Sequence, residues 1–130
     1  MYIKDENGQA IVEFALVLPL LLLLVCGIID FGWIFGNQLM ANNACREATR
    51  YSAIHYNDSD ADNDQTVATQ IITNSAPTLI SPMVTLTKST ADDSVKVVVT
   101  SQVNVLTPIL SSFFPDGKYT VSAQCVMKLE

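Results

Sequence analysis

The chain has 130 residues, of which 49% are hydrophobic and only 15% are charged, with a formal net charge of −6. An acidic balance argues against a nucleic-acid-binding protein, which presents a basic face to phosphates. The high share of apolar side chains argues against intrinsic disorder. These apolar residues crowd into the first third of the chain, which disfavours a compact enzyme built from its whole length.

The first apolar stretch predicts a helix that spans a membrane. The run from Ile11 to Ile29 is interrupted only by one acid, Glu13, and one proline, Pro19. As a helix it would span roughly 28 Å, close to the ~30 Å hydrocarbon core of a bilayer. The remaining ~100 residues are too few to wrap so apolar a helix inside a soluble core. We therefore expect a transmembrane helix over residues 9–35.

The carboxylate of Glu13 needs a partner, because a charge inside a bilayer costs about 3 kcal/mol at its centre. The neighbouring helix sequence offers no cation. Cleavage after Gly8 would place a new ammonium group on Gln9, about one helical turn from Glu13, and this group could pair within one chain or between subunits. Residues 1–8 are then a leader peptide. The alternative is a glutamate whose side chain reaches the headgroups and has no role.

These residues resemble a known family. The stretch from Gly8 to Phe14, Gly-Gln-Ala-Ile-Val-Glu-Phe, looks like the processing site of type IV prepilins in the tight-adherence (Tad, or Flp) branch. Three further segments are similar to TadE-like pseudopilins in particular: Leu18–Leu21, Gly27–Gly32 and Asn43–Tyr51. The resemblance implies that a prepilin peptidase cuts between Gly8 and Gln9. It also implies that Glu13 and Phe14 form the processing and assembly motif.

The same resemblance implies a function and a location. It implies a minor pilin-like subunit that is required to assemble a Tad/Flp adhesion pilus. Such a subunit crosses the inner membrane once, with its C-terminal domain outside the cytoplasm. The implied partners are the prepilin peptidase, other pilin-like subunits and the Tad secretion machinery.

Beyond the span, the helix is expected to continue as a stalk over residues 36–56. Small and aromatic residues recur there at spacings of three and four, which predicts one common face: Ala41, Ala44, Ala48, Tyr51 and His55. Small residues let another element approach closely. That element could be the chain's own domain or a neighbouring subunit.

Residues 57–130 are expected to form an extracytoplasmic α+β domain. A second helix is predicted from about Gln65 to Ser75, capped by Asp62 or Asp64 and ended at Ala76–Pro77. Three short strands are predicted to form an antiparallel sheet: Val84–Thr87, Val95–Val105 and Tyr119–Met127. A turn at residues 89–94 would join the first two strands. A short apolar connection, Thr107–Phe114, and a turn at residues 115–117 would precede the last strand.

Neither the acidic loop nor the cysteines predict a metal site. Three acids have calcium-loop spacing (Asp58, Asp60 and Asp62), but Asn63 and Thr69 stand where such a loop needs glycine and glutamate. The three cysteines are too scattered for a zinc or redox motif. Cys26 is expected to be an apolar residue of the span. Cys45 and Cys125 are expected in an oxidising compartment, where they could form a disulfide or stay as buried thiols.

No nucleophile–base pair is evident in the sequence, and the lone His55 has no catalytic neighbours in its pattern. We therefore expect no enzyme activity, no cofactor, no small-molecule substrate and no nucleic-acid partner. The alternative to a pilus subunit is a signal-anchored periplasmic binding module unrelated to pili.

Overall fold

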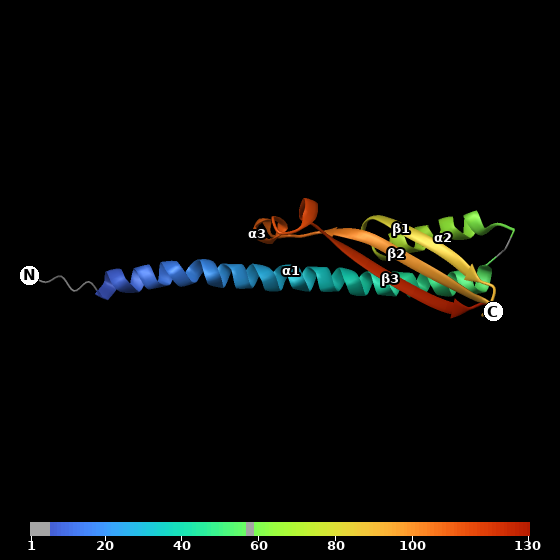
Figure 1. Ribbon diagram of the computed structural model, residues 1–130, viewed down its shortest axis with the longest axis horizontal. Coiled ribbons are helices and arrows are strands. Elements are labelled where there is room, and N and C mark those ends of the chain that lie inside the picture. Colours follow the sequence, from blue (N-terminus) through green and yellow to red (C-terminus); the bar gives the residue numbers. More distant parts are fainter. Residues whose placement is uncertain (1–5, 57–58) are drawn as a thin grey trace, which may run out of the picture.

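The structure is a computed structural model that describes residues 6–56 and 59–130 (Figure 1). Within these ranges the chain forms, in order, α1 (Glu6–His55), α2 (Ala61–Ser75), β1 (Ile80–Ser89), β2 (Ser94–Asn104), α3 (Pro108–Ser111), the 3-10 helix η1 (Pro115–Gly117) and β3 (Lys118–Lys128). The long N-terminal helix, the second helix and the three-stranded antiparallel sheet make an α+β fold, so the predicted fold class is confirmed. Of the expected leader, residues 1–8, only residues 6–8 are described.

Helix α1 has two halves with different surroundings. Its N-terminal half extends away from the rest of the molecule, and its C-terminal half lies against the sheet (Figure 1). Pro19 lies in the first half, where its missing N–H removes one bond of the helical ladder, yet the helix is continuous from Glu6 to His55. The expected span and the expected stalk therefore lie on one rod.

The sheet is antiparallel, with β2 between β1 and β3. The turn predicted at residues 89–94 is confirmed, because it joins β1 to β2. On β2, every second residue from Val95 to Val103 is buried, as the alternation of a half-covered strand requires. Val97, in this buried set, lies opposite Cys125 on β3.

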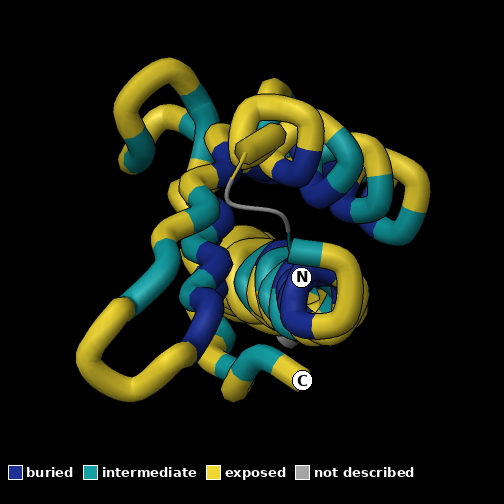
Figure 2. Tube along the Cα trace, turned by 90° about the vertical axis from the view of Figure 1, so that its right-hand side faces the viewer, coloured by how far each residue is buried: buried dark blue, intermediate teal, exposed yellow. Residues whose placement is uncertain are grey.

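The two longer helices pack on the same face of the sheet and form the second layer of a two-layer fold (Figure 2). Helix α1 lies over β2 and β3, and α2 lies over β1. The core between the layers combines small side chains of α1 with branched side chains of α2 and the sheet: Ala41, Ala44, Ala48, Ile72, Val97, Val99, Val103 and Val121. The small residues bring the backbone of α1 close to the strands, as predicted for this part of the helix.

The buried face of α1 departs from the predicted one after Ala48. Tyr51 and His55 are exposed, and their rings stack with centroids 4.2 Å apart. Ser52 and Ala53 are buried instead. An α-helix has about 3.6 residues per turn, so residues spaced alternately by three and four drift slowly around it. The predicted face was therefore wrong at its C-terminal end.

The second helix begins earlier than predicted. It starts at Ala61 rather than near Gln65, and Asp60 occupies the N-cap position without a side-chain hydrogen bond to the helix. The prediction that Asp62 or Asp64 caps the helix is wrong, because both lie in its first turn. Acidic side chains in a first turn interact favourably with the helix dipole, so the acidic run extends the helix rather than preceding it.

The first strand is longer than its sequence pattern predicted. It begins at Ile80 instead of Val84 and has an irregular register between Ile80 and Met83. Pro82 lies in this irregularity, next to Ser81, whose φ is 45°. An edge strand tolerates a bulge and a residue without an N–H. The other two strands differ from the predicted ranges by one residue at their ends.

Candidate functional site

The N-terminal half of α1 exposes apolar side chains all around the helix. It is long and apolar enough to cross a membrane, and none of its most apolar stretch is buried. The exposed side chains include Leu16, Leu20, Leu21, Leu24 and Ile28. Successive positions are about 100° apart around a helix, so these side chains point in several directions. Water solvates such a surface poorly, so lipid or other apolar helices must cover it.

The predicted cleavage site lies at the start of this half. Gly8 and Gln9 are exposed, close to the beginning of α1 at Glu6. A Cβ atom at Gly8 would meet no atom within 4 Å, so no packing contact requires glycine there. The N–H groups of a first helical turn have no helical acceptors, and helix ends fray. Cleavage here would require the helix to unwind locally around this peptide bond.

Glu13 lies one helical turn after Gln9, on the same face of α1. Its carboxylate is exposed and forms no hydrogen bond or ion pair with the part of the chain that the structure describes. Phe14, the next residue, is 64% exposed. The structure therefore places the predicted cleavage and assembly residues together near the N-terminal end of the described part of α1.

Asp30 joins the apolar half of α1 to the connection after β2, a role that no sequence pattern predicted. Only 3% of this residue is exposed. Its Oδ1 accepts hydrogen bonds from the backbone N–H groups of Leu106 (2.9 Å) and Thr107 (3.1 Å). Its Oδ2 accepts another from the Thr107 hydroxyl. Hydrogen bonds to a carboxylate are stronger than those between neutral groups, so Asp30 holds the chain after β2 against α1.

Further polar contacts continue from Asp30 toward the C-terminal half of α1. The indole N–H of Trp33 donates to the carbonyl oxygen of Asn104 (3.1 Å). The side-chain amide of Asn37 donates to the carbonyl oxygen of Trp33 (2.8 Å), and its Oδ1 accepts from the Thr78 hydroxyl (2.5 Å). The sequence signal for these contacts is only that Asp30 and Asn37 are polar residues within an otherwise apolar and aromatic stretch. Their partners lie too far along the chain for pattern reasoning to find.

Cys45 and Cys125 lie next to each other in the core. The Cys45 thiol donates to the carbonyl oxygen of Val97 (3.4 Å), and Val97 is the β2 residue opposite Cys125. Burial raises the pKa of the Cys45 thiol to about 12, and the adjacent Cys125 side chain contributes to the rise. Both cysteines are free thiols in this structure, and so is Cys26. The fold therefore brings together the two cysteines that were considered as a disulfide pair.

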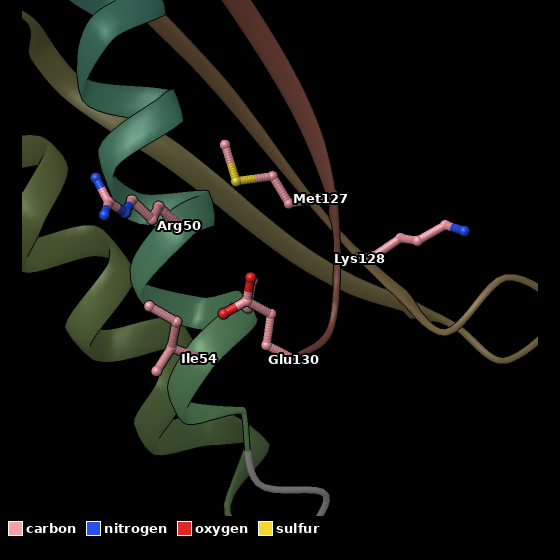
Figure 3. Close-up of a pocket in the computed structure, with 6 residues that line it drawn as sticks. Arg50, Ile54, Met127, Lys128 and Glu130 are labelled. Carbon is pink, nitrogen blue, oxygen red and sulfur yellow. The ribbon is translucent and has the colours of Figure 1, made fainter.

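An open cavity of about 350 Å³ lies near the C-terminal end of α1 (Figure 3). Its lining consists of Arg50, Ala53, Ile54, Met127, Lys128 and Glu130. Figure 3 shows Glu130 beside α1 and the Lys128 side chain turned away from it. The backbone N–H of Glu130 donates to the carbonyl oxygen of Ala53 (3.2 Å). This lining contains neither histidine nor cysteine, and the Glu130 hydrogen bond ties the chain after β3 to α1.

Within the described ranges, no three His, Cys, Asp or Glu side chains are placed to hold a metal ion. Asp60 and Asp62, from the calcium-like spacing, lie at the N-terminus of α2, and Asp58 lies outside the described residues. His55 is in the last turn of α1, with its Nδ1 3.1 Å from the carbonyl oxygen of Tyr51. Of these residues, Asp60, Asp62 and His55 lie at helix ends.

The N-terminal helix is similar to a known family over most of its length. Residues 8–50 match the family model described as TadE-like protein. This segment is TadE-like. The resemblance predicted from the sequence is confirmed over a range that contains the candidate cleavage site, Glu13, Phe14 and most of α1. No curated protein and no solved structure matches the chain.

The TadE-like match indicates a Tad pilus-associated protein with an N-terminal apolar helix. The family is structural rather than enzymatic. The matched range ends at Arg50, so α2 and the sheet lie beyond the TadE-like segment. Asp30 and Trp33 belong to that segment, whereas their partners Thr107 and Asn104 do not. These contacts therefore fix the TadE-like helix to a domain that the family model does not cover.

Proposed function

We propose that this chain is a minor pilin-like subunit required to assemble a Tad/Flp adhesion pilus. The observation that carries the proposal is the exposed apolar half of α1, which lies in the TadE-like segment and is long enough to cross a bilayer once. Residues 9–35 then cross the inner membrane, residues 36–56 form the stalk, and residues 57–130 lie outside the cytoplasm. The partners are the prepilin peptidase, other pilin-like subunits and the Tad secretion machinery.

Cleavage between Gly8 and Gln9 is part of the same proposal. The prepilin peptidase removes residues 1–8, and the new ammonium group on Gln9 pairs with the Glu13 carboxylate of its own or a neighbouring chain. Gln9 and Glu13 share one helical face, which supports the pairing. An isolated carboxylate in hydrocarbon is costly, and an ion pair there is far less so. Pairing between chains favours the packing of apolar helices side by side.

Intact-mass measurement of the membrane-extracted protein, combined with piliation assays, tests this function. We expect the loss of residues 1–8, about 1 kDa. This segment holds one lysine and two acids, so the side-chain charge changes from −6 to −5. A strain without this protein should lose its Tad pili and regain them on complementation. A periplasmic binding module unrelated to pili would leave piliation unchanged and would keep the leader.

We also propose a disulfide bond between Cys45 and Cys125, because their thiols lie next to each other. Their bond would join β3 to the stalk part of α1. A disulfide donor of the exporting compartment would accept the two electrons, while both thiols lose their protons. Because the pKa of Cys45 is about 12, its thiolate is scarce at neutral pH, so reaction at this thiol is slow in the folded domain.

The disulfide is checked by mass spectrometry of the exported protein with and without a reductant. We expect the untreated chain to be about 2 Da lighter than the reduced chain. The Cys125→Ala variant should show no difference, whereas the Cys26→Ala variant should behave like the wild type. Equal masses before and after reduction of the wild-type protein would show that both thiols stay free.

A further inference from the structure

Between β2 and β3 the chain forms an apolar segment, residues 105–115, that the proposed function does not use. We refer to it as the α3 segment. It contains no charged residue, and Leu106, Ile109 and Phe113 on it are exposed. Phe113 is 78% exposed, although phenylalanine is among the residues most often buried. Large apolar side chains grouped on one loop indicate a surface that contacts lipid or protein.

The α3 segment lies beside α1 at the end of the apolar span (Figure 1). The hydrogen bonds of Asp30 hold its first residues there, and Asp30 directly follows Ile29. The helix from Ile11 to Ile29 covers roughly 28 Å, close to the thickness of a bilayer's hydrocarbon core. If that stretch fills the core, the α3 segment lies where hydrocarbon meets the headgroups.

The exposed apolar surface continues onto α1 at the same level. Phe31 is 72% exposed, and its ring stacks with that of Phe35 at a centroid distance of 6.2 Å. Trp33 lies between them in sequence. On the α3 segment, the ring of Phe114 lies nearly perpendicular to that of Tyr119, with their centroids 6.1 Å apart. Aromatic side chains, and especially Trp and Tyr, are enriched at membrane interfaces.

The polar groups of the α3 segment are largely satisfied within the protein. The first backbone N–H groups donate to Asp30, and those of Phe113 and Phe114 donate to carbonyl oxygens of the segment itself. The hydroxyls of Ser111 and Ser112 donate to one backbone carbonyl oxygen. The backbone polar groups of a loop usually form hydrogen bonds with water. When these groups are bonded within the protein instead, transfer of the loop out of water costs little free energy.

We propose that the α3 segment is a membrane-interface anchor, with Leu106, Ile109 and Phe113 inserted among the headgroups and upper acyl chains of the bilayer that α1 crosses. This rests on the membrane insertion of α1 in the proposed function. The absence of charge from the segment and its continuity with the exposed aromatic surface of α1 favour lipid as the occupant. Because both α1 and the α3 segment would contact the membrane interface, the height of the domain above the membrane and its rotation about α1 would be fixed.

Depth-dependent fluorescence quenching tests the anchor in the full chain. A single introduced cysteine carries an environment-sensitive fluorophore, and the protein is reconstituted at high dilution in phosphatidylcholine–phosphatidylglycerol vesicles. The lipids carry a quencher either near the headgroup or near the end of the acyl chain. Cys26 and Cys125 are replaced by alanine. Cys45 stays, because its side chain is fully buried and burial raises the pKa of its thiol, which leaves little reactive thiolate.

Three labelled positions provide the comparison. Phe113→Cys reports on the α3 segment, and Leu20→Cys reports on the apolar half of α1. Val126→Cys is the matched control, because Val126 is an exposed apolar residue near the other end of β3. Circular dichroism confirms that each labelled chain keeps its helix and strand content.

We expect the quencher near the headgroup to reduce emission at position 113 several-fold more than at position 126. The deep quencher should act mainly at position 20. Quenching at 20 without quenching at 113 would overturn the anchor and leave the membrane insertion of α1 standing. Absence of quenching at both 20 and 113 would overturn the anchor and the membrane insertion of α1. Blue-shifted, unquenched emission at 113 that disappears on dilution would identify a second copy of the chain as the occupant and would also overturn the anchor.

Discussion

Replacement of Gly8 by valine is expected to abolish removal of the leader while leaving the fold intact. The space around Gly8 is open in the free chain, so the new side chain meets no atom of the protein near its Cβ. In the proposed cleavage, by contrast, we expect the residue before the cut to enter a peptidase pocket that fits glycine. A steric mismatch of this kind costs at least about tenfold in rate. Intact-mass analysis of membrane extracts measures the trimmed fraction, and piliation should fall with it.

Two control variants separate side-chain size from helix stability. Valine and alanine both favour a helix more than glycine does, and a firmer first turn resists the unwinding that cleavage needs. Gly8→Ala stabilises the turn but adds only a methyl group. If Gly8→Ala is trimmed and Gly8→Val is not, the size of the valine side chain blocks cleavage. Gly36→Val makes the same change at another exposed glycine of α1 with open space around it, and it should be trimmed normally. Normal trimming of Gly8→Val would contradict the proposed cleavage site.

Much of the fold could be predicted because its elements are encoded locally. The long apolar run indicated the exposed half of α1, and alternating valines indicated β2. Turn residues indicated the hairpin and the short connection before β3. The same local patterns misplaced the start of α2, because aspartate suits both a cap and a first helical turn. They also missed the beginning of β1, where Pro82 normally argues against a strand.

The rest depends on contacts between residues far apart in the chain. Asp30 and Thr107 are 77 residues apart, and Trp33 and Asn104 are 71 apart. Such contacts arise only when the sheet settles on α1 in a particular register, which no local pattern records. The predicted processing residues needed no such information, because they are neighbours on one helix.

Replacement of Glu13 by glutamine is expected to leave cleavage intact and to reduce pilus assembly at least about tenfold, which corresponds to ~1.4 kcal/mol. An ammonium and a carboxylate about 4 Å apart attract each other by about 4 kcal/mol at an effective dielectric constant of 20. The amide keeps the shape of the side chain but removes this attraction. In the proposed order of events, cleavage of the bond between Gly8 and Gln9 precedes the pairing, so it should continue. The trimmed fraction is measured by intact mass, and assembly by the amount of sheared pili.

The controls for this variant vary the charge and its position on α1. Glu13→Asp keeps a carboxylate and should recover part of the assembly. Glu47→Gln removes a carboxylate from the same helix outside the span, where Glu47 accepts a hydrogen bond from Ser75, and it should assemble nearly as well as the wild type. If Glu13→Gln assembled normally, an uncharged side chain would suffice at this position. Glu13 would then be a glutamate that reaches the headgroups, and the apolar surface of α1 alone would bring the subunits together.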